Sequence, residues 1–179
     1  MKFESGTTLK LNARLGHTTL AAQRDSETYI YLTAHAPTGA AVVSPAPVNL
    51  AIVIDRSGSM SGKRLQNAKD AARGMINRMR DGDVVSVVTY NTKGETLISP
   101  TAVNTQSRER VITALSNIRA AGDTCISCGV DAAMENLRGR RGMVNRMLLL
   151  SDGEATAGIR NVDGFRQIAL RARDMGCSI

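Results

Sequence analysis

The sequence VNLAIVIDRSGSM, at residues 48–60, decides the fold class of this chain of 179 residues. Its first seven residues, 48–54, form an almost continuous apolar run, interrupted only by Asn49. A strand of a parallel sheet needs such a run because helices cover both of its faces. In a strand with one solvent-exposed face, apolar and polar residues alternate instead. The run stops at Asp55 and passes into a turn rich in serine and glycine. We therefore predict a central buried strand whose carboxyl end carries polar side chains.

The segments that follow residue 60 alternate between helical and strand-like patterns. Apolar side chains recur at helical spacing over residues 63–80, after Ser61 as a candidate N-cap, and residues 84–90 repeat the buried-strand pattern. The remaining predicted elements are a short strand at 96–98, helices at 106–118 and 127–137, a strand at 147–150 and a helix at 163–175 that Gly176 ends. Strands that alternate with helices predict an α/β fold with a doubly wound, mostly parallel sheet flanked by helices.

The first quarter of the chain has a different pattern of apolar and polar residues. Residues 7–36 alternate with a period of two, which predicts two or three antiparallel strands with turns near Gly16 and residues 24–26. Residues 37–47 are rich in proline and alanine and are typical of a connection. We therefore expect a small N-terminal β segment over residues 1–46 and an α/β domain over 47–179. The last three residues resemble the beginning of another strand.

Composition narrows the classes of function. The net charge of +7 is spread along the chain, with its densest cluster at residues 138–141, and aromatic residues make up only 3%. Nucleic-acid binding needs aromatic stacking residues or a recognisable module, and neither is visible, so we expect no nucleic-acid partner. No run approaches the ~20 apolar residues of a membrane span, and none resembles a signal peptide, so we expect a cytoplasmic protein.

Polar residues follow two of the predicted parallel strands. Asp55, Ser57 and Ser59 follow the first, and Asp152 follows the strand at 147–150. Carboxyl ends of parallel strands share one edge of the sheet, and Thr124 lies just before a predicted helix that can begin at that edge. Small oxygen ligands of low total charge suit a hard cation, above all Mg²⁺, with Mn²⁺ or Ca²⁺ as alternatives. In the alternative interpretation, Asp55 and Ser59 only cap the following helix.

This set of residues resembles the metal-ion-dependent adhesion site of von Willebrand factor A domains, which is an Asp-x-Ser-x-Ser loop, a Thr on a second loop and an Asp on a third. The resemblance covers about residues 48–179. It implies that Asp55, Ser57, Ser59, Thr124 and Asp152 hold one divalent cation, directly or through water. An exposed Asp or Glu of a partner protein would complete the coordination.

The chain departs from that family at three places, of which Ser151 in place of a common threonine is a harmless change. Asp123 stands where many relatives have a glycine, and its charge can modulate the site by tightening metal binding or weakening anionic ligands. The final strand and helix of the family are also not found, so a separate chain or segment is expected to complete the sheet.

The sequence contains three cysteines, and two of them form a C-x-x-C pair, Cys125 and Cys128, at the predicted start of a helix. Three interpretations remain open. The favoured one treats them as free thiols that pack as small apolar residues, and the sparse, odd count fits a reducing cytoplasm. A regulatory disulfide is the second, since a helix N-terminus favours redox chemistry. A zinc site would need further ligands nearby.

The leading functional prediction is a metal-dependent protein-binding module and not an enzyme, because no general base or nucleotide-binding loop accompanies the polar set. A Mg²⁺-dependent phosphatase of the haloacid-dehalogenase type is an alternative. It would require a second acid two residues after Asp55, where Ser57 stands. A further alternative, suggested by resemblance to bacterial relatives, is an adaptor or assembly subunit that works with an AAA+ ATPase.

Overall fold

The computed structural model describes residues 2–5, 9–17, 19, 28–35 and 45–179. The chain divides into two compact units, Met1–Pro45 and Ala46–Ile179. The expected turn at residues 24–26 and most of the expected connection at 37–47 lie outside the described residues. No helix in the described part of the chain combines the length and the apolar character that crossing a bilayer requires.

The N-terminal unit contains a three-stranded antiparallel sheet in the order β1-β2-β3. Its strands are β1 (Lys2–Ser5), β2 (Leu9–Leu15) and β3 (Ile30–His35). The register places Leu11 opposite Ala34 and Leu15 opposite Ile30, so apolar residues of the two strands share one face. The expected antiparallel β segment is therefore confirmed, with a first strand that begins earlier than the alternation indicated.

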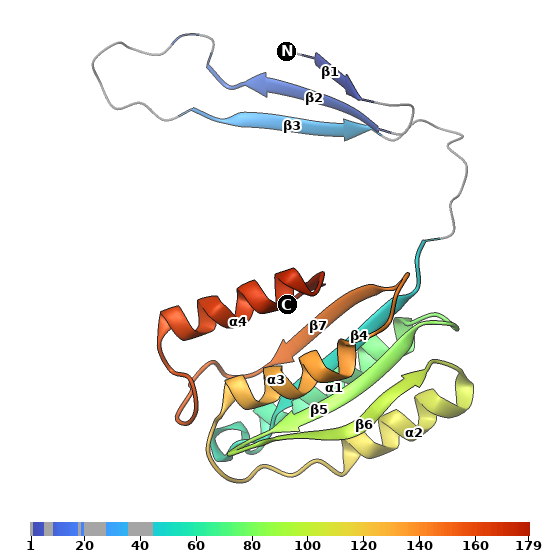
Figure 1. Ribbon diagram of the computed structural model, residues 1–179, viewed down its shortest axis with the longest axis vertical. Helices are drawn as coiled ribbons and strands as arrows, with labels where there is room; N and C mark the ends of the chain where they lie inside the picture. The colour runs from blue at the N-terminus through green and yellow to red at the C-terminus, as the bar shows by residue number, and fades with distance from the viewer. Residues whose placement is uncertain (1, 6–8, 18, 20–27, 36–44) are drawn as a thin grey trace. The chain divides into compact units, whose positions relative to one another are not determined.

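The second unit is built on a five-stranded sheet in the order β6-β5-β4-β7-β8 (Figure 1). The central strand β4 pairs in parallel with β5 and β7, β7 pairs in parallel with β8, and only β6 runs antiparallel. The strands are β4 (Val48–Asp55), β5 (Val84–Tyr90), β6 (Gly94–Ala102), β7 (Val144–Leu150) and β8 (Cys177–Ser178). This mostly parallel sheet confirms the predicted fold class.

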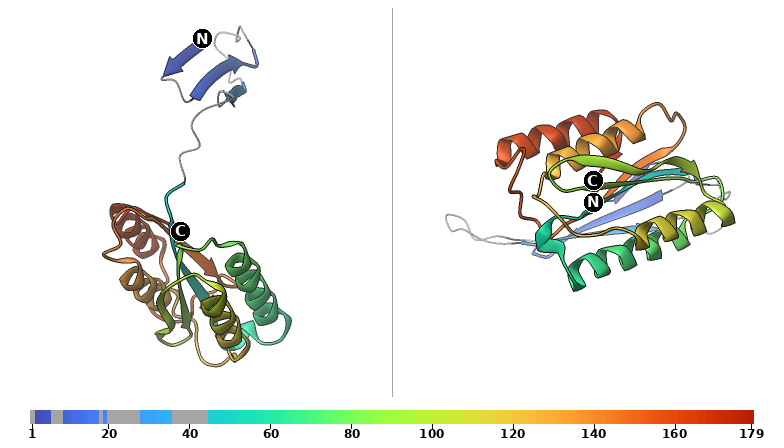
Figure 2. Two further views of the ribbon diagram at one scale, coloured as in Figure 1. Left: turned by 90° about the vertical axis from the view of Figure 1, so that its right-hand side faces the viewer. Right: turned by 90° about the horizontal axis from the view of Figure 1, so that it is seen from below.

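Helices cover both faces of this sheet (Figure 2). Helices α1 (Lys63–Arg78) and α2 (Thr105–Ser116) lie on one face, and α3 (Ile126–Leu137) and α4 (Val162–Asp174) lie on the other. Alternate residues of β4 serve the two layers, because Ile52 and Ile54 pack with the first pair of helices whereas Val53 packs with the second. This double burial is the physical reason why residues 48–54 are apolar without alternation.

Asp83 fixes the beginning of the central strand. This buried side chain precedes β5 and accepts hydrogen bonds from the backbone N–H groups of Val48 and Arg80, both at 2.8 Å. The start of β4 is thereby tied to the loop between α1 and β5. The strand then crosses the core, and its last residue, Asp55, lies at the carboxyl end of the sheet.

Helix α1 begins at Lys63 as predicted, but its N-cap residue differs from the prediction. Its N-cap is Gly62, with φ of 77° and ψ of −130°, and not Ser61. The Ser61 hydroxyl instead donates to the Gly58 carbonyl at 2.8 Å, closing the short 3-10 helix Gly58–Met60. A positive φ is strained for residues with a side chain, so glycine is favoured at position 62 and the helix begins one residue later than a serine cap would allow.

Candidate metal site at the carboxyl edge of the sheet

The register of the sheet brings the ends of three strands together. Asp55 is the last residue of β4 and pairs with Tyr90, the last residue of β5. On the other side, Ile54 pairs with Leu150, so Ser151 and Asp152 leave β7 beside Asp55. The expected meeting of residues from separate loops at one edge therefore follows from parallel pairing.

Asp55 is fully buried and is held by three hydrogen bonds. Its Oδ1 accepts from the Ser57 backbone N–H at 2.8 Å, and its Oδ2 accepts from the hydroxyls of Tyr90 at 3.1 Å and Ser151 at 2.9 Å. Burial, together with the neighbouring Asp55 carboxylate, raises the pKa of Tyr90 above its usual value, so the phenol keeps its proton and donates. No Lys, Arg or His of the described residues forms an ion pair with this carboxylate.

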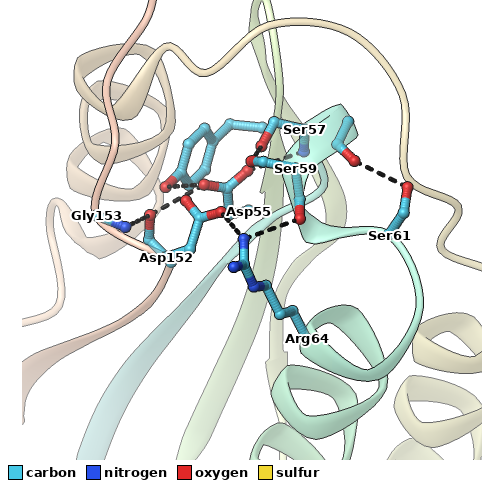
Figure 3. A network of polar contacts seen from close by, with 10 residues as sticks. Asp55, Ser57, Ser59, Ser61, Arg64, Asp152 and Gly153 are labelled. Carbon is cyan, nitrogen blue, oxygen red and sulfur yellow. Dashed lines mark hydrogen bonds and ion pairs between the residues drawn. The ribbon is translucent and has the colours of Figure 1, made fainter.

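The two predicted serine ligands lie directly beside this carboxylate (Figure 3). The hydroxyls of Ser57 and Ser59 are 3.1 Å apart, one buried and the other exposed. The third serine of the loop, Ser61, lies apart from this group (Figure 3). Ser57 and Ser59 therefore present two adjacent hydroxyl oxygens on one side of Asp55.

Asp152 faces the same group from the end of β7 (Figure 3). Its Oδ2 accepts from the Arg64 guanidinium, with Nη1 at 3.2 Å, and the same Nη1 also donates to the Ser59 carbonyl at 3.3 Å. The other carboxylate oxygen, Oδ1, is buried and has no hydrogen-bond partner among the residues that the structure describes. A buried carboxylate oxygen without a partner is costly, so it is a position that a further donor or a cation would stabilise.

Thr124 lies on a loop that is fastened beside the first one. The Gly58 N–H donates to the Gly122 carbonyl at 2.9 Å, and the Ala121 N–H donates to the Arg56 carbonyl at 2.7 Å. Thr124 itself is buried, but within the described part of the chain no hydrogen bond joins its hydroxyl to Asp55, Ser57, Ser59 or Asp152. Asp123 is exposed, and its N–H donates to the Thr92 hydroxyl at 3.3 Å.

The donor set fits a hard divalent cation. It combines a fully buried carboxylate, two adjacent hydroxyls and a second carboxylate; within the described part of the chain the first carboxylate has no cationic contact and one oxygen of the second has no partner. Oxygen ligands of this kind suit Mg²⁺, Mn²⁺ or Ca²⁺. Across the described residues no three His, Cys, Asp or Glu side chains form a metal-binding group, and a site of this composition has only two carboxylates. Half of its ligands would be serine hydroxyls.

The cysteine pair beside the second loop forms a disulfide. Cys125 and Cys128 are joined, with Cα atoms 5.3 Å apart, at the N-terminal end of α3. The favoured expectation that both are free thiols is therefore wrong for this structure, and no thiolate of the pair remains for zinc. Cys177 in β8 is buried and free. The argument that sparse cysteines indicate a reducing cytoplasm loses its basis, because oxidised pairs are more common outside that compartment.

Thiol counting gives a direct test of this disulfide. Protein purified without reductant and unfolded in guanidinium should react with one equivalent of an alkylating agent, at Cys177. After reduction it should react with three equivalents. Intact mass spectrometry separates the two products. Three alkylated cysteines before reduction would show that the pair is not oxidised in the purified protein.

Sequence reasoning did not assign roles to three residues of this network, namely Tyr90, Ser151 and Arg64. The position of Tyr90 at the end of the neighbouring strand is a signal that could have identified it, because parallel register places it opposite Asp55. Ser151 immediately precedes Asp152 and could have been identified in the same way. Arg64 carries no such signal, since its contact joins residues 88 positions apart.

An open α/β sheet with an Asp-x-Ser-x-Ser loop at its carboxyl edge defines a class of domains that commonly mediate protein–protein interactions. The family model of the von Willebrand factor type A domain matches residues 50–154. The chain belongs to this family.

Relatives and solved structures agree with this assignment. A protein of Synechocystis, sll0103, is 33% identical over 109 residues, which cover 60% of this chain and 26% of the relative. The structure of a von Willebrand factor type A protein from Catenulispora acidiphila matches 96% of this chain and 40% of its own, with a TM-score of 0.70 and 20% identity. Proximal thread matrix protein 1 of the mussel byssus, solved with a zinc-occupied MIDAS motif, covers 74% of this chain and 37% of its own. Its TM-score is 0.63 and its identity is 17%. The chain thus spans less than half of the length of each.

Proposed function

We propose that this chain is a metal-dependent protein-binding module. In this proposal Asp55, Ser57, Ser59 and Asp152 hold one divalent cation at the carboxyl edge of the sheet, and Thr124 contributes from the second loop. The bound cation would supply a Lewis-acidic site for an acidic side chain of a partner. Mg²⁺ is the favoured ion.

One observation carries the proposal. The hydroxyls of Ser57 and Ser59 are 3.1 Å apart beside the fully buried Asp55 carboxylate, and the Asp152 carboxylate faces the same group. Among the described residues, Asp55 has no cationic contact and Asp152 Oδ1 has no hydrogen-bond partner. Asp55 is compensated by neutral donors alone, and one oxygen of Asp152 is buried without a partner among the described residues, so a divalent cation would stabilise both carboxylates. The mussel structure with an occupied MIDAS motif supports the proposal by likeness of fold.

The same residues argue against the phosphatase alternative. The residue two positions after Asp55 is Ser57, and its hydroxyl is far too weak an acid to replace the carboxylic acid that this chemistry needs. A role as an adaptor for an AAA+ ATPase is compatible with a binding module and remains a prediction from resemblance.

Paired peptide arrays test the proposal. Each random peptide with a central Glu is spotted beside the same peptide with Gln, and the labelled chain is applied in Mg²⁺ or in EDTA. We expect retention on a subset of Glu peptides that EDTA abolishes and that the matching Gln peptides do not show. The contrary result is retention that is the same for Glu and Gln peptides, or that is unchanged by EDTA.

A further inference from the structure

Arg64 occupies an unusual position for a cationic side chain. It is the second residue of α1, in the turn where the helix dipole is positive, and that turn contains no acidic residue to compensate the charge. A cation in the first turn of a helix is unfavourable for the helix itself. The role of Arg64 therefore has to come from contacts outside α1.

Those contacts are made with the candidate metal site. One guanidinium nitrogen, Nη1, donates both to Asp152 Oδ2 at 3.2 Å and to the Ser59 carbonyl at 3.3 Å (Figure 3). Within the described residues, Arg64 is the only cationic side chain that pairs with Asp152. The guanidinium thus neutralises one of the two carboxylates that the proposed cation would use.

The two side chains of this ion pair differ in their exposure to solvent, so Arg64 is freer to move than Asp152. The Arg64 side chain is 65% exposed, whereas that of Asp152 is 13% exposed. A groove lies between α1 and β7, and Arg64 and Asp152 line it together with Asn67 and Ala71. The guanidinium can swing into this groove and into water at little cost, whereas Asp152 is held at the end of its strand.

We propose that Arg64 competes with the divalent cation for Asp152 and thereby lowers the metal affinity of the site. This inference rests on the proposed function. Without metal, Arg64 compensates the Asp152 carboxylate; when metal binds, Arg64 has to release it. The positive guanidinium near the site also repels a divalent cation, so both effects act in the same direction.

Charge-removing variants test the inference, with Mn²⁺ as the probe and the EPR signal of free Mn²⁺ as the readout. Arg64→Gln should bind Mn²⁺ about 5-fold to 20-fold more tightly than the unchanged protein, the size expected for losing a part-exposed ion pair and a nearby repulsion. Arg64→Lys, which keeps the charge, should stay within about twofold of the unchanged protein.

Arg73→Gln is the matched control. It removes the same charge from the same helix, where Arg73 pairs with Asp70 at 2.6 Å. It lies nine residues further along α1, about 14 Å away along the axis, which is beyond the screening length of about 10 Å at 0.1 M salt. Its Mn²⁺ affinity should equal that of the unchanged protein. Melting curves in EDTA verify that each variant is folded.

The possible outcomes separate the two proposals. If the unchanged protein binds Mn²⁺ and Arg64→Gln binds it equally or more weakly, competition by Arg64 is wrong and the metal site stands. If Arg64→Gln binds Mn²⁺ and the unchanged protein shows no binding, competition is supported in its strongest form. If neither protein binds Mn²⁺, both proposals are overturned.

Discussion

Replacing both Ser57 and Ser59 by alanine should weaken Mg²⁺ binding by at least about 100-fold, because losing even an outer partner of a metal site costs about 10-fold to 100-fold and these hydroxyls are proposed to touch the ion. The two hydroxyls bond to each other, at 3.1 Å. The hydrogen bond from the Ser57 backbone N–H to Asp55 survives the change. The folded loop should therefore persist, at a cost of about 1 kcal/mol. Isothermal titration with Mg²⁺ measures the effect.

Ser61→Ala is the matched control, since it deletes a hydroxyl from the same loop. The Ser61 hydroxyl donates to the Gly58 carbonyl and lies apart from the carboxylates (Figure 3). We expect Ser61→Ala to keep the Mg²⁺ affinity of the unchanged protein. Equal losses in the double variant and in Ser61→Ala would point to damage of the loop, and full Mg²⁺ affinity in the double variant would exclude these serines as ligands.

Strands β4 and β5 could be predicted because a strand that is buried on both faces has a continuous apolar sequence. Strand β5 has the predicted bounds, and β4 extends one residue beyond them to include Asp55. The edge strand β6 was predicted only at residues 96–98, although it spans Gly94–Ala102. It is partly exposed, contains Pro100 and has irregular register with β5, so its sequence lacks both continuous apolar character and regular alternation.

The residues of the candidate site likewise fall into a group that could be predicted from the sequence and a group that could not. Asp55 and Asp152 could be placed at the same end of the sheet because they lie at the carboxyl ends of adjacent parallel strands. Ser57 bonds to Asp55 through its backbone N–H, and Ser59 bonds to Ser57. The contact of Arg64 with Asp152 could not be predicted, since it depends on how a long side chain crosses from a helix to another loop.

The disulfide between Cys125 and Cys128 could not be predicted from the sequence either. A C-x-x-C spacing permits a disulfide, a metal site or two packed thiols, and the sequence does not state whether the two sulfur atoms are bonded, as they are in this structure. The Thr124 hydroxyl shows the same limit, because its position in the chain matches the family motif, whereas no hydrogen bond among the described residues joins it to the other candidate ligands. Its assignment as a ligand remains a prediction.

Replacing Gly94 by alanine should destabilise the second unit by about 3 kcal/mol, at the upper end of the cost of overpacking a filled site. Gly94 opens β6, and a Cβ there would collide with the backbone carbonyl of Cys128 in the first turn of α3. A Cβ at Gly129, in the same turn, would likewise collide with the Tyr90 ring. These glycines let the β5–β6 hairpin pack tightly against the start of α3, so relief would require moving the backbone of one against the other.

Gly74→Ala provides the matched comparison for urea unfolding followed by circular dichroism. Gly74 lies inside α1, and a Cβ there would meet no atom within 4 Å. Alanine at that position should stabilise the protein by about 0.5–1 kcal/mol, because glycine is a poor helix former. The same glycine-to-alanine change should thus act in opposite directions at the two positions. If Gly94→Ala unfolded at the same urea concentration as the unchanged protein, the hairpin and α3 would not approach as closely as the structure places them, and Tyr90 would lose that constraint on its position beside Asp55.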